Sequence, residues 1–283
     1  MQQSAGEMLG AAVTELARLV ADRRAAALAD EPDAVHQLRT AVRRIRNVLA
    51  VFRRCFDAEA AAELRGSLES YGDLLGQCRD LEVRAEHCEG AIVSVGLDDL
   101  REPLVVPLLA AHRAAHEVLV AWHRGPDVAA LDALLATWSV APPLTDRARR
   151  PAEKVATKAV RRQVERVLAA THHLDDPDHV DEAHEVRKAA RRLRHAADAV
   201  SRPPASTLAG WAPTVGGLGQ RIQGMLGDHR DALLLADHVR EHAADVADPA
   251  PYLQLVAHAE REARQAIGGL VQAVLELRDA RHP

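Results

Sequence analysis

Two stretches of the chain carry the same pattern and decide the fold. Val35–Phe52 reads VHQLRTAVRRIRNVLAVF, and Ala183–Val200 reads AHEVRKAARRLRHAADAV. They align without a gap, so that the basic residues pair as His36 with His184, Arg39 with Arg187, Arg43 with Arg191, Arg44 with Arg192, and Arg46 with Arg194. A long pattern that returns once predicts an internal duplication.

A second pair of stretches supports the duplication. Leu74–Val83 reads LLGQCRDLEV, and Met225–Leu235 reads MLGDHRDALLL. Each contains Leu-Gly, two further residues and then Arg-Asp, in the same order after the first pattern. We therefore expect two related halves, 1–141 and 144–283, separated at Ala141-Pro142-Pro143, where consecutive prolines end a helix.

The composition predicts an all-α protein. Hydrophobic residues make up 48% of the chain and aromatic residues only 2%, so the core must be built from Ala, Leu and Val. Ala and Leu favour helices, and the chain is poor in the β-branched and aromatic runs that strands need. Periodicity and breakers predict helices over 5–29, 35–56, 58–75, 79–95, 99–124 and 127–138 in the first half. In the second half we expect helices over 144–172 and 183–200, a glycine-rich helical stretch to Gly227, and helices over 228–244 and 249–278.

Charge is concentrated although the chain is acidic overall. The formal net charge is −5, yet His36–Arg54 contains six arginines and no acid. Of the 36 basic residues only Lys154, Lys158 and Lys188 are lysines. Arginine pairs bidentately with phosphate or carboxylate, so these segments predict a local anion-binding site. The rest of the acidic chain would repel the anion.

On a helical wheel the basic and apolar stripes of each pattern lie side by side. Like charges three or four residues apart repel, so a stripe of them without interleaved acids needs a compensating anion or acidic face. A single basic stripe is more often a solvated surface, but its duplication favours a basic trough between neighbouring helices. The candidate anion-binding residues are His36, Arg39, Arg43, Arg44, Arg46, Arg54, His184, Arg187, Lys188, Arg191, Arg192 and Arg194, with Lys154, Lys158 and Arg161 on the preceding helix of the second half.

Motifs for other chemistry are missing. The pairs His112 with His116 and His238 with His242 have metal-binding spacing, but no HExxH or His-Asp motif accompanies them. There is no phosphate loop with its Lys and no nucleophile elbow. We therefore predict neither a cofactor nor a metal nor a catalytic residue.

The remaining features suit a cytoplasmic protein. The cysteines Cys55, Cys78 and Cys88 are odd in number and form no CxxC pair. No signal-peptide pattern opens the chain, and no apolar run approaches the ~18 residues of a membrane span.

The two His-x-x-Arg-x-x-x-Arg-Arg-x-Arg helices resemble the signature helices of the CHAD domain, the conserved histidine α-helical domain. The Leu-Gly-x-x-Arg-Asp segments at Leu75–Asp80 and Leu226–Asp231 resemble its following motif. The resemblance implies two tandem four-helix-bundle-like halves of long antiparallel helices, related by a pseudo-twofold axis. It also implies a basic groove that binds inorganic polyphosphate without catalysis, and association with polyphosphate granules.

This chain departs from the family pattern at two places. His195 stands where the second signature helix often has an aromatic residue, and Thr40 stands where the second half has Lys188. Nothing before the first helix resembles the triphosphate-tunnel catalytic domain of many relatives, so their activity is not transferred.

Two other functions remain as alternatives. A metal-dependent phosphohydrolase acting on polyphosphate or a nucleoside triphosphate would need carboxylates that hold a divalent metal near the trough. A nucleic-acid-binding protein is disfavoured by the net charge and by the scarcity of aromatic residues for base stacking. Arg79 with Asp80, and Arg230 with Asp231, could form salt bridges or contact ligand, and self-association stays open.

Overall fold

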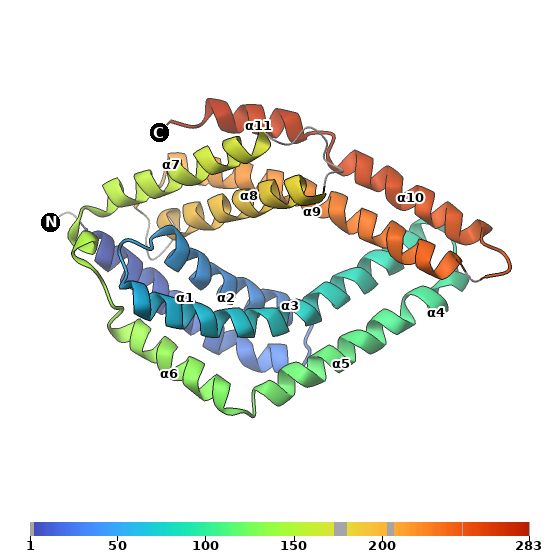
Figure 1. Cartoon of the computed structure of the whole chain (residues 1–283), viewed down its shortest axis with the longest axis horizontal. Helices are drawn as coiled ribbons and strands as arrows, with labels where there is room; N and C mark the ends of the chain where they lie inside the picture. The colour runs from blue at the N-terminus through green and yellow to red at the C-terminus, as the bar shows by residue number, and fades with distance from the viewer. Residues whose placement is uncertain (1–2, 173–179, 203–206, 245, 283) are drawn as a thin grey trace.

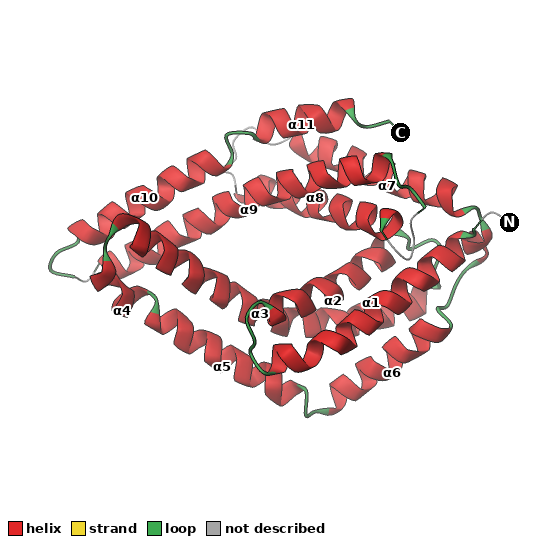
Figure 2. Ribbon diagram, turned by 180° about the vertical axis from the view of Figure 1, so that it is seen from behind, coloured by secondary structure: helices red, strands yellow, loops and turns green. Residues whose placement is uncertain are grey.

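The computed structural model describes residues 3–172, 180–202, 207–244 and 246–282. It confirms the all-α fold, since the described residues form helices and no strand (Figure 2). The first half of the chain forms α1 (Ala5–Leu28), α2 (Ala34–Val51), α3 (Ala58–Val95), α4 (Arg101–Leu104), α5 (Val106–Trp122) and α6 (Pro126–Val140). The second half forms α7 (Ala152–Thr171), α8 (Val180–Ser201), α9 (Trp211–Ala243), α10 (Ala250–Ala266) and α11 (Leu270–Asp279).

The helices form two groups that meet at both ends of an elongated frame (Figure 1). In one group α2 packs against α1 and α3, while α5 packs against α3 and α6 against α1. In the other group α8 packs against α7 and α9, and α10 and α11 pack against α9. The groups also touch within the frame, where α2 contacts α8. The two signature helices are therefore neighbours.

Hydrogen bonds join the two groups at the ends of the frame. Near the N-terminus, the amide of Ala5 donates to the carbonyl of Arg150 at 2.8 Å. At the opposite end, Nε2 of His238 on α9 lies 3.0 Å from the carbonyl oxygen of Leu104 on α4. Ser94 on α3 reaches His258 on α10 there, with Oγ and Nε2 3.1 Å apart.

The main core runs through both groups. It contains the apolar faces of α1, α2 and α3 together with those of α7, α8 and α9. A second core lies at the far end, where α3 meets α4, α9 and α10. The assignment of 1–141 and 144–283 to separate bundles, and their origin by duplication, stay predictions.

Several expected helix boundaries were wrong. α3 continues through Gly76 and α9 through Gly227, although breaks were expected at both glycines. The last helix is instead divided at Ile267–Gly269 into α10 and α11, and α7 begins at Ala152 rather than Leu144. A single glycine costs a helix only about 1 kcal/mol, which the packing of a long buried face outweighs.

Two glycines on α9 are required by its close approach to α8. A Cβ at Gly216 would lie 2.7 Å from the Cβ of Ala197, and a Cβ at Gly219 would lie 3.0 Å from the carbonyl oxygen of Ala190. The glycine-rich composition of this segment therefore serves helix packing. It does not mark a loop.

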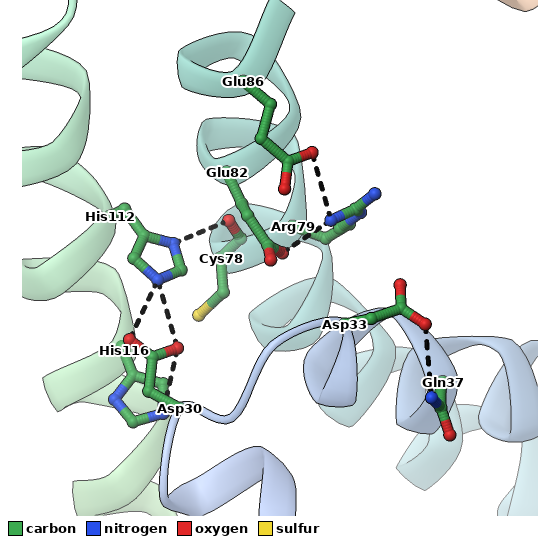
Figure 3. Close-up of polar contacts among 9 residues, drawn as sticks. All are labelled: Asp30, Asp33, Gln37, Cys78, Arg79, Glu82, Glu86, His112 and His116. Carbon is green, nitrogen blue, oxygen red and sulfur yellow. Dashed lines mark hydrogen bonds and ion pairs between the residues drawn. The ribbon is translucent and has the colours of Figure 1, made fainter.

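The start of α2 is anchored to α5 by a histidine (Figure 3). Asp30 has a positive φ of 53°, and its carboxylate accepts a hydrogen bond from Nε2 of His112 at 3.2 Å. Nδ1 of His112 lies 3.2 Å from the carbonyl oxygen of Cys78 on α3. His112 thus ties the α1–α2 turn to α3 and α5, and it is buried, whereas the sequence had suggested an exposed helix histidine.

One stretch, Asp98–Trp122, is long and apolar enough to cross a membrane by length and composition. It contains Arg101, Glu102, Arg113 and Glu117, and its α5 portion packs against α3. No apolar run of this length was expected from the sequence, and a single such helix is weak evidence for a span. The acidic cluster Asp175–Asp178 and the prolines Pro203 and Pro204, which we used to place helix ends, lie outside the described residues.

Candidate functional site: a cluster of signature arginines

The apolar face of each signature helix fixes the direction of its arginines. On α2, Leu38, Val42, Ile45 and Leu49 are buried in the core. On α8, Val186, Ala190, Leu193 and Ala197 are buried in the same way. Because the basic stripe lies beside the apolar stripe, burying one face brings the arginines to the edge of the contact between the two helices.

Arg43 on α2 and Arg191 on α8 are near enough for the charge of Arg191 to act on Arg43. Burial, followed by the positive charges of Arg39, Arg191 and Arg194, lowers the pKa of Arg43 to about 9. Burial, followed by the charges of Arg187 and Arg39, lowers the pKa of Arg191 to about 10. Both groups remain cationic at pH 7, so like charges from two helices are held together at an energetic cost.

We name this group the signature cluster: Arg39, Arg43 and Arg46 of α2 with Arg187, Arg191 and Arg194 of α8. Its charge is only partly compensated. Arg39 pairs with Asp80 at 3.3 Å and Arg46 with Glu69 at 2.6 Å, both acids belonging to α3. The Nε atoms of Arg43 and Arg194 are buried without a hydrogen-bond partner among the residues that the structure describes. An anion that entered the cluster would therefore meet unsatisfied charge.

The Arg-Asp motif of the second half faces the cluster as well. Burial lowers the pKa of Arg187, Arg230 lowers it further, and Asp231 opposes both effects. Burial raises the pKa of Asp231, and the charge of Arg187 opposes that shift. Asp80 and Asp231 thus lie beside the first arginines of the two signature helices.

Glycines on α3 provide room for the α2 arginines. A Cβ at Gly76 would lie 3.4 Å from a terminal nitrogen of Arg39, and one at Gly72 would lie 3.4 Å from a terminal nitrogen of Arg46. In the first half, the presence of glycine in the Leu-Gly motif is therefore explained, because the guanidinium of Arg39 lies over Gly76. The corresponding Gly227 has no such neighbour within 4 Å.

The side chain of Arg79 pairs with acids of its own helix, α3, and does not belong to the cluster (Figure 3). Its Nη1 lies 2.9 Å from Glu82 and 3.6 Å from Glu86, and only 16% of its side chain is exposed. Its charge still reaches His36, whose pKa is lowered by burial first and by Arg79 second. The salt-bridge interpretation of Arg79 is thus the one its geometry favours.

The histidines near the cluster are held neutral. Burial and Arg187 lower the pKa of His184, the counterpart of His36. His195 is only 6% exposed, and burial followed by Arg43 and Arg194 places its pKa well below 6.5. At neutral pH none of these three side chains adds charge to the cluster.

Four of the expected site residues lie apart from the cluster. Arg44 lines a pocket of about 270 Å³ between α1, α2 and α8, together with Glu15, Asp198 and Arg202. Lys188 pairs with Glu185 at 3.2 Å, and Arg161 lies 3.7 Å from Glu165. The charge of Arg192 lowers the pKa of Arg166, so Arg192 lies near α7.

Three more expected residues gather at the end of α2. Arg54, Lys154 and Lys158 line a cavity of about 210 Å³ between the turn after α2 and the first turns of α7. We call this cavity the end pocket. Its basic lining consists of Arg53, Arg54, Arg147, Arg150, Lys154, Lys158 and Arg162.

Sequence reasoning missed several residues of both regions. Asp80 and Asp231 were noted as parts of Arg-Asp pairs, but their place beside Arg39 and Arg187 depends on how α2, α3, α8 and α9 pack. Arg147 and Arg150 were visible as part of a basic segment, but nothing in the sequence places that segment beside the end of α2. Within the described part of the chain, no three His, Cys, Asp or Glu side chains gather where they could hold a metal.

Similarity to known proteins supports the fold. PptA from Streptomyces chartreusis has a TM-score of 0.73 at 22% identity, over 96% of this chain and 99% of that one. The CHAD domain from the plant Ricinus communis has a TM-score of 0.67 at 18% identity, over 99% of this chain and 92% of that one. Both structures contain a fold like the one described here.

Sequence relatives and a family model agree with the structures. The uncharacterized protein Rv2226 of Mycobacterium tuberculosis is 29% identical over 230 residues, which cover 76% of this chain and 41% of the relative. The uncharacterized protein MT2285 of another strain is 28% identical over the same shares. The chain thus spans about two fifths of the length of these relatives. The model of the CHAD domain matches residues 11–240, and the chain belongs to the CHAD domain family.

Proposed function

We propose that the protein binds inorganic polyphosphate, without catalysis, in a basic groove formed by the signature cluster. The observation that carries this proposal is the meeting of Arg43 and Arg191 from two helices, at which burial and like charges lower the pKa of both. The arginines of the cluster repel one another, so a bound polyanion stabilises their arrangement. The family is related to polyphosphate binding in general and is a family of binding domains rather than catalytic ones.

The chemistry of the cluster suits a chain of phosphates. Arginine offers paired N–H donors to phosphate oxygens and remains charged at neutral pH. Arg39 and Arg46 lie on the same side of α2 as Arg43, and Arg187 and Arg194 flank Arg191 on α8. Internal phosphates carry about one charge each, so a linear chain matches successive arginines along the two helices. Association with polyphosphate granules in the cytoplasm follows as the proposed cellular role.

The direct test is charge reversal at the centre of the cluster. We expect the double variant Arg43→Glu with Arg191→Glu to lose at least about 100-fold in affinity for long-chain polyphosphate at moderate salt. Calorimetric titration measures this affinity. Arg113→Glu with Arg124→Glu makes the same change in net charge on two exposed residues, one in the middle of α5 and one just after its end, and should retain wild-type binding.

A milder variant protects the test against misfolding. Arg39→Gln with Arg187→Gln removes two charges at the edge of the cluster without placing acids in the helix contact. We expect about a 10-fold loss, with an unchanged circular dichroism spectrum. If both doubles bind as tightly as the wild type, the cluster does not bind polyphosphate.

The same preparation tests the alternatives. Release of phosphate from polyphosphate in the presence of Mg²⁺ or Mn²⁺ would contradict the non-catalytic assignment. Double-stranded DNA that displaces polyphosphate at equal phosphate concentration would contradict the preference for polyphosphate. We expect neither result.

A further inference from the structure

The end pocket is lined by more basic residues than the signature cluster contains, and by no acid. All the charged residues of its lining are basic: Arg53, Arg54, Arg147, Arg150, Lys154, Lys158 and Arg162. In the signature cluster, by contrast, Asp80 and Glu69 pair with two of the arginines. The two acids next to the lining in sequence, Asp146 and Glu153, do not line the pocket, and Asp146 pairs with Arg149.

The charges of several of these cations act on two neighbouring groups, Arg166 and Cys55. Burial, followed by the charges of Arg192, Arg162 and Arg53, lowers the pKa of Arg166, which lies one turn beyond the lining. Cys55 lies in the lining, and the charges of Arg147 and Arg150 oppose the rise in its pKa that burial causes. Cations from the turn after α2, the segment before α7 and α7 itself therefore converge on one cavity.

The walls of the pocket limit what can enter. Phe52, Val155 and Ala159 form an apolar side, so the cavity is closed there. α7 begins at Ala152 after Pro151, which makes no side-chain cap, and the positive end of this 20-residue helix adds to the field. A cavity of about 210 Å³ takes a compact group rather than a passing chain.

We propose that the end pocket is a second anion site that takes a doubly charged phosphate group, either the terminal phosphate of a polyphosphate chain or that of a free short oligophosphate. A terminal phosphate, like a phosphate monoester, loses its second proton near about pH 6 and so carries nearly two charges at pH 7. Internal phosphates carry one. The site with the greater excess of cations thus matches the more highly charged group. The chain-end form of the proposal rests on the proposed function, whereas the free-oligophosphate form stands without it.

The probe for this site is tripolyphosphate, which has two terminal phosphates and is too short to follow the signature helices. We expect Lys154→Glu with Lys158→Glu to weaken its binding at least 10-fold in calorimetric titration. Both lysines are exposed, so the fold is not at risk. The surface double Arg113→Glu with Arg124→Glu should bind tripolyphosphate within about threefold of the wild type.

Two results overturn the proposal. One is tripolyphosphate binding that survives in the Lys154 and Lys158 double variant, and the other is binding that falls as far in the surface double Arg113→Glu with Arg124→Glu. Failure of the proposed function has a different signature from failure of the end-pocket proposal. It would appear as unchanged binding of long chains by the Arg43 and Arg191 double variant. The pH dependence adds a second readout: affinity for tripolyphosphate should rise severalfold from pH 5 to pH 7.5 as the terminal phosphates ionise.

Long chains with both ends esterified distinguish the two sources of the phosphate. If the pocket holds chain ends, blocking the ends weakens binding to the wild type but not to the Lys154 and Lys158 double variant. If the pocket holds free oligophosphate, blocked and unblocked chains bind the wild type alike, while tripolyphosphate still depends on the two lysines.

Discussion

Asp80 is an acid placed against the arginine that a polyanion would have to reach. It pairs with Arg39 at 3.3 Å, and 67% of its side chain is exposed. Such an exposed pair contributes at most about 1 kcal/mol to stability, so its removal leaves the fold intact. The carboxylate repels phosphate while it restrains the guanidinium, and at low salt we expect the repulsion to dominate.

Replacing Asp80 with Asn should therefore tighten polyphosphate binding about two- to fivefold. The gain should fade at high salt, where exposed charges are screened. Titration of polyphosphate at two salt concentrations measures both effects. A weaker affinity in Asp80→Asn would mean that orienting Arg39 matters more than removing the negative charge.

His195 makes the helix contact sensitive to acid. It faces Arg43 and Arg44 on α2 and Arg191 and Arg194 on its own helix, while Asp198 lies in the same pocket. Because its pKa is lower in the folded protein than in the unfolded chain, the unfolded chain binds more protons below pH 6.5. Stability is therefore retained at neutral pH and falls as the pH decreases.

We expect His195 to account for about 1.4 kcal/mol of lost stability at pH 5.5 relative to pH 7.5. His195→Gln should lose correspondingly less between these pH values, although His36 and His184 add smaller effects of the same sign. Urea unfolding at both pH values gives the comparison. Equal losses in the variant and the wild type would contradict the assignment.

Among the helices, periodicity predicted faces better than it predicted ends. The apolar stripe of α2 over Leu38, Val42 and Ile45 was read from spacing and is buried as expected. The breaks expected at Gly76 and Gly227 were wrong, because a local propensity cannot weigh the tertiary packing that carries a helix through a glycine. Gly216 and Gly219 show the same limit. They are required by the close approach of α9 to α8, which local propensity does not include.

The packing of α9 on α8 allows a matched pair of substitutions. Gly216→Ala would bring a Cβ within 2.7 Å of the Cβ of Ala197 and should destabilise the protein by about 1–3 kcal/mol. Gly217→Ala, one residue along, meets nothing within 4 Å and should stabilise by about 0.5–1 kcal/mol through helix propensity. Thermal unfolding of both variants provides the test. Similar effects at the two sites would show that the helices can separate without cost.

For the whole molecule, the sequence could state which residues repeat but not which helices would touch. The matching patterns predicted two basic stripes, and the contact between α2 and α8 brings Arg43 and Arg191 together. The end pocket depends on a different long-range contact, between the turn after α2 and the start of α7. Spacing within a helix gives the face of a side chain, whereas its neighbours come from the packing of distant segments.

The signature cluster lies where the two groups of helices meet, so a ligand there should stabilise the whole fold. A ligand at 100 times its dissociation constant contributes about 2.7 kcal/mol, which in a protein of this size corresponds to a rise in Tm of about 4–5 °C. Differential scanning calorimetry with long-chain polyphosphate measures this shift. If four arginines engage phosphates, affinity should fall about 50-fold between 50 and 200 mM salt, and the shift should shrink with it. The double variant Arg43→Glu with Arg191→Glu should show a much smaller shift, because only the end pocket then remains to bind the chain. A shift that is independent of salt would place the binding outside the cluster of arginines.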